Sequence, residues 1–139
     1  MHRVPSPCSG LWADPIIGQV NVTGPVALRR WAPVLVWAGV IFALSSVPDL
    51  GTGLGTWDLV LRKLAHAAEY AILGALLLRA LDRELPALAL GIAYAASDEL
   101  HQHFVQGRTG APLDVLIDAV GVVVGVTAWR RFGRSRLGR

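Results

Sequence analysis

The sequence predicts an all-α integral membrane protein, a bundle of four transmembrane helices with both termini in the cytoplasm. Hydrophobic residues make up 53% of the 139 residues and charged residues only 17%, whereas a soluble domain carries about 25% charged residues. The chain divides into four largely apolar segments of about the length that crosses a bilayer, and only the first of them is free of charge. The chain is too short for a second sizeable domain. Its single cysteine, Cys8, excludes a disulfide framework and a cysteine-rich zinc module.

The first predicted span covers residues 31–47, which carry no charge, and Pro48 is expected to end it. The residues before it are punctuated by proline and glycine and contain no continuous apolar stretch, unlike a signal peptide. We therefore expect residues 1–28 to form a disordered cytoplasmic tail, residues 29–131 the transmembrane domain, and residues 132–139 a basic cytoplasmic tail.

The other three spans are predicted over residues 59–81, 86–104 and 112–129. The second and fourth are polar in their first part and apolar afterwards, whereas the third is apolar first and polar at its end. A short polar turn joins the second span to the third, which Pro86 is expected to open because proline is tolerated in the first helical turn.

The basic residues indicate how the spans are oriented. The net charge is +3, from 13 Lys+Arg against 10 Asp+Glu. The positive-inside rule places the arginine-rich segments in the cytoplasm and the loops 49–58 and 105–111, which hold only Arg108, outside. We therefore expect a multi-pass protein of the bacterial inner (cytoplasmic) membrane, with no nucleic-acid partner. The arginines on the cytoplasmic side are Arg29, Arg30, Arg79, Arg83, Arg130, Arg131, Arg134, Arg136 and Arg139.

This orientation gathers the polar residues of three spans at one depth. The second and fourth spans enter from outside and the third leaves outward, so their polar parts all lie in the outer half of the membrane. An ionisable group inside a membrane is costly unless it faces a cavity or a partner, so the gathering predicts a functional site. Its members are Lys63, His66, Glu69, Tyr70, Asp98, Glu99, His101, Gln102, Asp114 and Asp118, with Arg108 in the outer loop.

Because successive residues of a helix are about 100° apart, the spacing shows which of these polar residues share a helix face. Lys63, His66 and Tyr70 share one stripe of the second span. Asp114 and Asp118 share a face of the fourth span, so we expect both to point into the bundle. The residues that continue this face and allow close helix approach are Gly121 and Gly125.

Two residues near the end of the third span are predicted to lie outside the centre of this site. Asp98 is read as lying at a different angle from Glu99 and Gln102, which predicts a surface group near the membrane interface. His103 is predicted to be a loop residue. No spacing of potential ligands is diagnostic of a metal site, so neither a metal nor a cofactor is expected.

The residue types suit proton transfer beside an anionic headgroup. Glu99 is a candidate general acid or base, and His66 an assisting base. Lys63 and Arg108 are cations suited to phosphate. The remaining predicted binding residues are Gln102 and Tyr70, and the residues predicted to orient the others are Asp114, Asp118 and Asp98.

Three segments together resemble VanZ-like membrane proteins. Residues 62–70 resemble that family's basic-x-x-His-x-x-x-Tyr segment, and residues 97–108 its Ser-Asp-Glu-x-x-Gln segment and Gly-Arg. Residues 114–125 resemble its Asp-x-x-x-Asp-x-x-Gly-x-x-x-Gly helix. The resemblance, over about residues 31–130, implies a small multi-helix inner-membrane protein linked to the cell envelope. The family is named for low-level teicoplanin resistance, so the resemblance implies a link to antibiotic susceptibility.

Three functions stay open on the residues alone. The chain could be an enzyme acting on a membrane lipid or lipid-linked envelope precursor. It could instead be a non-catalytic accessory protein that binds a headgroup, a glycopeptide or a partner protein. In the third possible function, the chain is structural: its polar residues neutralise one another and hold the helices together. Transport is disfavoured because residues 71–78, 87–96 and 119–129 provide no polar path through the inner half. Association into a homo-oligomer is left open.

Overall fold

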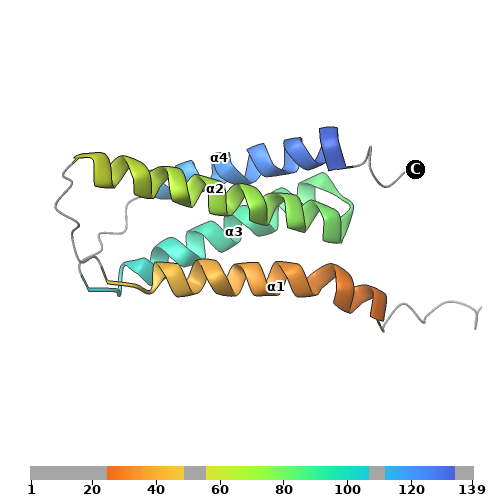
Figure 1. Cartoon of the computed structure of the whole chain (residues 1–139), viewed down its shortest axis with the longest axis horizontal. Helices are drawn as coiled ribbons and strands as arrows, with labels where there is room; N and C mark the ends of the chain where they lie inside the picture. Colours follow the sequence, from red (N-terminus) through yellow and green to blue (C-terminus); the bar gives the residue numbers. More distant parts are fainter. Residues whose placement is uncertain (1–24, 49–55, 107–111, 134–139) are drawn as a thin grey trace, which may run out of the picture.

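The computed structural model describes residues 25–48, 56–106 and 112–133, which are almost entirely helical (Figure 1). No strand occurs in these three ranges, so the all-α prediction is confirmed. The predicted disordered tail up to residue 24, the two outer loops at 49–55 and 107–111 with Arg108, and the basic tail after residue 133 lie outside the described residues. The elements in chain order are α1 (Pro25–Ser45), α2 (Thr56–Leu81), α3 (Glu84–Gln102), α4 (Pro112–Ala128) and one wider helical turn, η1 (Trp129–Gly133).

The first helix extends further toward the N-terminus than predicted. α1 begins at Pro25, so the assignment of residues 25–28 to a disordered tail is wrong. Proline suits the first helical position because it lacks the backbone donor that would be unpaired there. The helix ends at Ser45, before the predicted end at residue 47. Pro48 disfavours helical conformation in the residue that precedes it.

A tight turn reverses the chain between α2 and α3. Asp82 adopts a left-handed conformation with φ 55°, which aspartate tolerates better than most residues. Its backbone N–H donates to the Leu78 carbonyl at 2.8 Å and so closes α2. α3 then begins at Glu84, slightly earlier than predicted, and Pro86 falls within its first turn.

Three of the four helices are long and apolar enough to cross a membrane, over Ala27–Ser45, Val60–Leu81 and Pro112–Gly133. The prediction of four spans is therefore confirmed for α1, α2 and α4. α3 does not qualify by composition because its last turns carry Asp98, Glu99 and Gln102. Its crossing stays a prediction.

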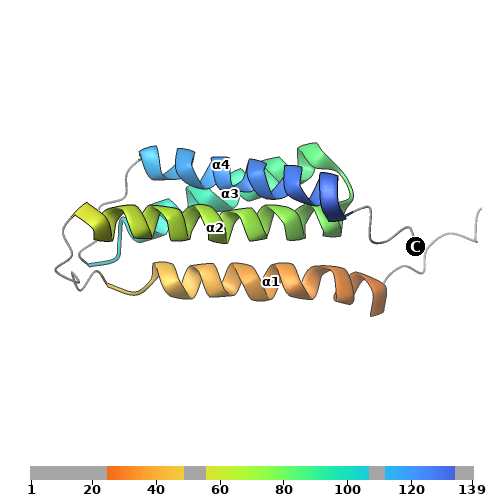
Figure 2. The same ribbon diagram turned by 45° about the horizontal axis from the view of Figure 1, so that its top comes forward.

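The helices form a bundle in which α2 and α4 run parallel to each other and antiparallel to α1 and α3 (Figure 1). α1 lies on the far side of α2 and α3 from α4 and packs only against those two among the described elements (Figure 2). The start of α1, the turn between α2 and α3 and the end of α4 share one end of the bundle. The arginines on these segments, within the described ranges, are Arg29, Arg30, Arg79, Arg83, Arg130 and Arg131.

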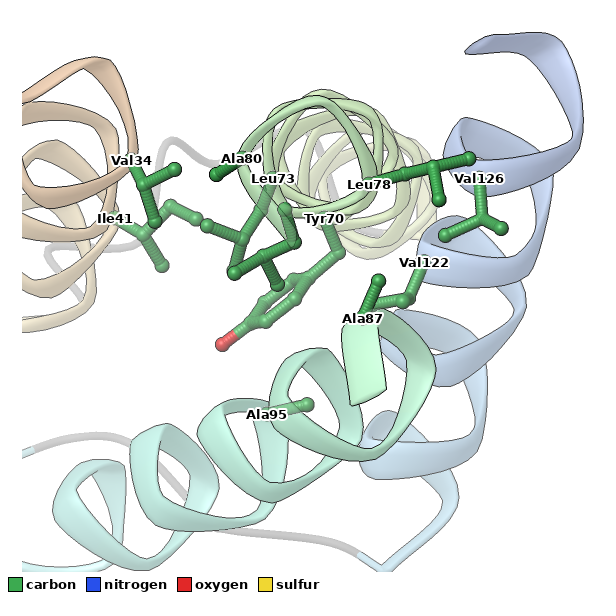
Figure 3. Close-up of a cluster of buried hydrophobic side chains, with 11 residues drawn as sticks. Val34, Ile41, Tyr70, Leu73, Leu78, Ala80, Ala87, Ala95, Val122 and Val126 are labelled. Carbon is green, nitrogen blue, oxygen red and sulfur yellow. The ribbon is translucent and has the colours of Figure 1, made fainter. Parts of the chain in front are cut away.

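The apolar interior is small, and most large apolar side chains face outward. Figure 3 shows the buried cluster, to which every α-helix contributes. Outward-facing residues such as Leu35, Leu116 and Val120 are more than half exposed. This distribution is expected where lipid tails, rather than water, surround the bundle.

The closest helix contact joins α2 and α4, and it confirms the predicted close approach at Gly121 and Gly125. A Cβ atom on Gly121 would collide with the Ala67 carbonyl oxygen, and one on Gly125 with the Ala71 carbonyl oxygen. On α2, a Cβ atom on Gly74 would lie 2.5 Å from the Val122 carbonyl oxygen. The two backbones therefore meet through small residues on both helices, and this fixes the register in which their polar halves face each other.

Candidate functional site

Polar side chains collect at the end of the bundle opposite the arginines, in two groups. The α2–α4 group lies between those two helices and comprises Lys63, His66, Asp114 and Asp118. The α1–α3 group joins those two helices and comprises Ser45, Ser46, Asp98, His101 and Gln102. The structure thus brings together residues that lie far apart in sequence, as the shared depth predicted.

The α2–α4 group consists of two acid–base pairs arranged along parallel helices. Lys63 Nζ pairs with Asp114 Oδ1 near the helix ends, where the side chains are 41% and 31% exposed. One turn deeper, His66 Nδ1 lies 3.7 Å from Asp118 Oδ1, with side-chain exposures of 20% and 1%. The predicted inward direction of Asp118 is confirmed, whereas Asp114 lies nearer the rim.

Asp118 is a buried carboxylate whose two oxygens have no hydrogen-bond partner among the described residues. The 3.7 Å separation from His66 is too long for a hydrogen bond, and the two groups form an ion pair only when the imidazole is protonated. A carboxylate beside Nδ1 favours the tautomer with its proton on that nitrogen, which leaves Nε2 as the basic nitrogen of the ring. His66 thus has the arrangement of an oriented general base.

The α1–α3 group is built around Asp98, which is 3% exposed. Ser45 Oγ donates to Asp98 Oδ2 at 2.7 Å, and Gln102 Nε2 donates to the same oxygen at 2.9 Å. The prediction that Asp98 is a surface group is therefore wrong. Residues four apart share a helix face, so Asp98 and Gln102 point the same way, and α1 covers the face that they share.

Ser45 and Ser46 are site residues that the sequence reasoning missed because they lie in an apolar run. Ser45 is 1% exposed, and Ser46 Oγ lies 3.1 Å from His101 Nε2. The His101 ring stacks on Phe42, with centroids 4.5 Å apart. The sequence feature that could have indicated their role is the pair of adjacent hydroxyls just before Pro48. The prediction for His103 is confirmed, because it lies exposed in the turn after α3.

Tyr70 lies between the two groups. Its side chain is fully buried, and its hydroxyl has no hydrogen-bond partner among the described residues. Figure 3 shows the ring extending from α2, with the hydroxyl directed to the side where α1 and α3 lie. Its ring packs at 6.3 Å from that of Tyr94. The Tyr94 hydroxyl in turn donates to the Ala38 carbonyl at 2.7 Å and ties α3 to α1.

The remaining predicted residues divide into buried, rim and undescribed positions. Glu99 is 7% exposed on α3. Glu69 is half-buried, and its backbone carbonyl accepts a hydrogen bond of 2.9 Å from Trp37 Nε1 of α1. Arg108 lies outside the described residues, so its predicted place is untested. Within the described ranges, no group of three or more His, Cys, Asp or Glu side chains is placed to hold a metal ion.

Replacing Ser45 by alanine tests how far the α1–α3 group supports the fold. The buried Asp98 carboxylate would lose its 2.7 Å donor, at an expected cost of about 1–3 kcal/mol in the free energy of unfolding. Thermal unfolding in detergent should show a lower midpoint than for wild type. Ser97→Ala is the matched control, because that exposed hydroxyl donates to the Tyr94 carbonyl of its own helix. Equal midpoints for both variants would contradict a stabilising role for Ser45.

Comparison with known proteins identifies one match. The family model described as VanZ/LLP1 matches residues 25–133, a range that contains all four helices and both polar groups. No curated protein and no solved structure matches the chain.

Proposed function

Because the chain belongs to the VanZ/LLP1 family, we propose that it is a four-span protein of the bacterial cytoplasmic membrane. Apart from Arg62 near the start of α2, the arginines of the described segments collect at one end of the bundle, and the polar groups lie at the other. The positive-inside rule then places both termini in the cytoplasm and the polar end in the outer half of the membrane. α3 would cross as a span of 19 residues, with its polar end packed against α1 through Ser45 and Asp98.

We propose further that this polar end binds and processes an envelope lipid or a lipid-linked precursor through its phosphorylated headgroup. The observation that carries the proposal is the set of buried oxygens without a hydrogen-bond partner among the described residues, on Asp118, Asp98 and Tyr70. A scaffold gains stability by satisfying such groups, since a buried unsatisfied polar atom costs about 1–3 kcal/mol. Unsatisfied oxygens that collect at one depth favour a site that a ligand completes.

Each residue of the site is assigned a role according to its position. Lys63, at the partly exposed rim, would contact the phosphate, together with Arg108 from the outer loop. His66, held by Asp118, would take a proton from an attacking water or hydroxyl, and the buried Glu99 would return one to the leaving group. Gln102 and Tyr70 would complete the binding surface, and Asp98 and Asp114 would orient their neighbours.

An effect on glycopeptide susceptibility is part of this proposal. A change in an outer-leaflet lipid or precursor alters the surface that teicoplanin meets. We therefore propose that loss of the activity changes teicoplanin susceptibility in the host.

The scaffold is the second candidate function, and specific contacts favour it. Asp98 holds two donors from two helices, and Lys63 is already paired with Asp114. Removing a donor to the buried Asp98 carboxylate costs about 1–3 kcal/mol, so a scaffold predicts loss of folded protein rather than loss of an activity.

Deletion of the gene, followed by complementation with wild type or Glu99→Gln, separates the two. At equal membrane abundance, the wild type should restore the envelope lipid profile measured by mass spectrometry and the teicoplanin susceptibility, and Glu99→Gln should not. Glu84→Gln is the matched control, because Glu84 pairs with Arg130 at the opposite end of the bundle. If Glu99→Gln restores the profile as fully as Glu84→Gln does, the site does not use Glu99 in catalysis.

A further inference from the structure

The buried charges of this bundle all have one sign. Within the described residues, the charged side chains classed as buried are Asp98, Glu99 and Asp118, and each is a carboxylate. In the α2–α4 group, Lys63 is 41% exposed and pairs with Asp114 at the rim, and the partly buried His66 lies beside Asp118. The interior of the polar end is therefore acidic, whereas its rim carries a cation.

Two of these carboxylates act on each other. Asp98 of α3 and Asp118 of α4 interact electrostatically, and both also act on the Tyr70 hydroxyl. Like charges that share a buried site repel because the low dielectric screens them little, and His66 beside Asp118 offsets part of that repulsion. A positive charge placed between them would relieve that repulsion.

The same three residues carry the buried oxygens that lack hydrogen-bond partners within the described ranges. These atoms are Asp98 Oδ1, both oxygens of Asp118, and the Tyr70 hydroxyl. All three side chains are more than nine-tenths buried. They come from α3, α4 and α2, three helices that pack against one another.

We propose that this interior binds the protonated primary amine of a headgroup. A primary ammonium carries three N–H donors, and Asp98, Asp118 and Tyr70 offer one acceptor each. Lys63 at the rim would meet the phosphate of the same headgroup. The inference rests on the proposed headgroup site and narrows its ligand to an aminated, zwitterionic lipid such as a phosphoethanolamine lipid, or to a free amine of the same kind.

A lipid panel tests the inference on the full-length chain in nanodiscs. The lipids are phosphatidylethanolamine, its N-acetyl derivative, phosphatidylcholine and phosphatidylglycerol, and retention of each is measured by native mass spectrometry. N-acetylation removes the charge, and phosphatidylcholine keeps the charge but has no N–H donor. We expect phosphatidylethanolamine to bind about tenfold or more tightly than the other three, since charged hydrogen bonds are worth about 1.5–3 kcal/mol. Water-soluble glycerophosphoethanolamine should compete only if a free amine is the source.

Variants assign the preference to the named residues. Asp98→Asn and Asp118→Asn should each abolish the preference for phosphatidylethanolamine, and Tyr70→Phe should reduce it. Asp82→Asn is the matched control, because Asp82 lies exposed in the turn at the opposite end of the bundle. Thermal unfolding of each variant shows whether it is folded, and the wild-type panel decides the question even if a variant is not.

The outcomes separate this inference from the proposed function. Equal binding of phosphatidylethanolamine and its N-acetyl derivative would overturn the proposal that the site recognises an amine. It would not contradict the proposal that the site binds a lipid headgroup. The absence of retention for every lipid in the panel and for lipid-linked precursors would overturn both. A preference that survives Asp98→Asn and Asp118→Asn would place the amine elsewhere and reject the site.

Discussion

Gly125→Ala is expected to remove most of the folded protein from the membrane. A Cβ atom at this position would collide with the carbonyl oxygen of Ala71, which is backbone and cannot rotate away. α2 and α4 would have to separate along their most extensive contact. Overpacking of this kind costs about 1–3 kcal/mol, and sometimes more, in the free energy of unfolding. The measurement is membrane abundance together with the unfolding midpoint in detergent.

Gly39→Ala is the matched control for this experiment. Gly39 lies in the middle of α1, and a Cβ atom there would meet nothing within 4 Å. Alanine favours a helix by about 1 kcal/mol over glycine, so this variant should be as stable as wild type or slightly more so. Equal stability of Gly125→Ala and Gly39→Ala would mean that α2 and α4 do not meet as described.

The helices themselves followed from the sequence, because long apolar runs bounded by proline and polar turns leave little choice inside a membrane. The small residues of α4 also predicted a close approach. What they could not predict was the partner. Only the structure shows that Gly121 and Gly125 face Ala67 and Ala71, which requires α2 and α4 to lie parallel and adjacent in this register.

The sequence predicted at which depth in the membrane the polar residues lie, but it did not predict which of them contact one another. Charge bias placed the polar residues at one end, but each contact depends on how neighbouring helices are rotated, which single-helix periodicity does not fix. Asp98 shows this limit, because it is buried by α1, a helix that looked purely apolar. Ser45 was overlooked for the same reason. A hydroxyl in an apolar run can be recognised as part of a site only when the acidic side chain that it contacts is known.

His66→Gln is expected to abolish the proposed activity while leaving the fold intact. Glutamine retains a polar side chain beside Asp118 but cannot act as a base near neutral pH. A positioned general base contributes about 10²–10⁴-fold to a rate. The measurement is the rate at which purified protein in vesicles consumes the lipid that accumulates in the deletion strain. The same variant should fail to restore the lipid profile in the host.

The pairing of His66 with Asp118 makes this prediction more specific than a loss of activity. If Asp118 acts by orienting the imidazole, Asp118→Asn should lower the same rate, and the double variant should be no slower than His66→Gln, since residues that act as a unit are not additive. His103→Gln is the matched control, because that histidine is exposed in the turn after α3. Independent, multiplicative losses from His66→Gln and Asp118→Asn would argue against an oriented base. A rate unchanged by His66→Gln at normal stability would remove the catalytic role of His66 and favour the scaffold.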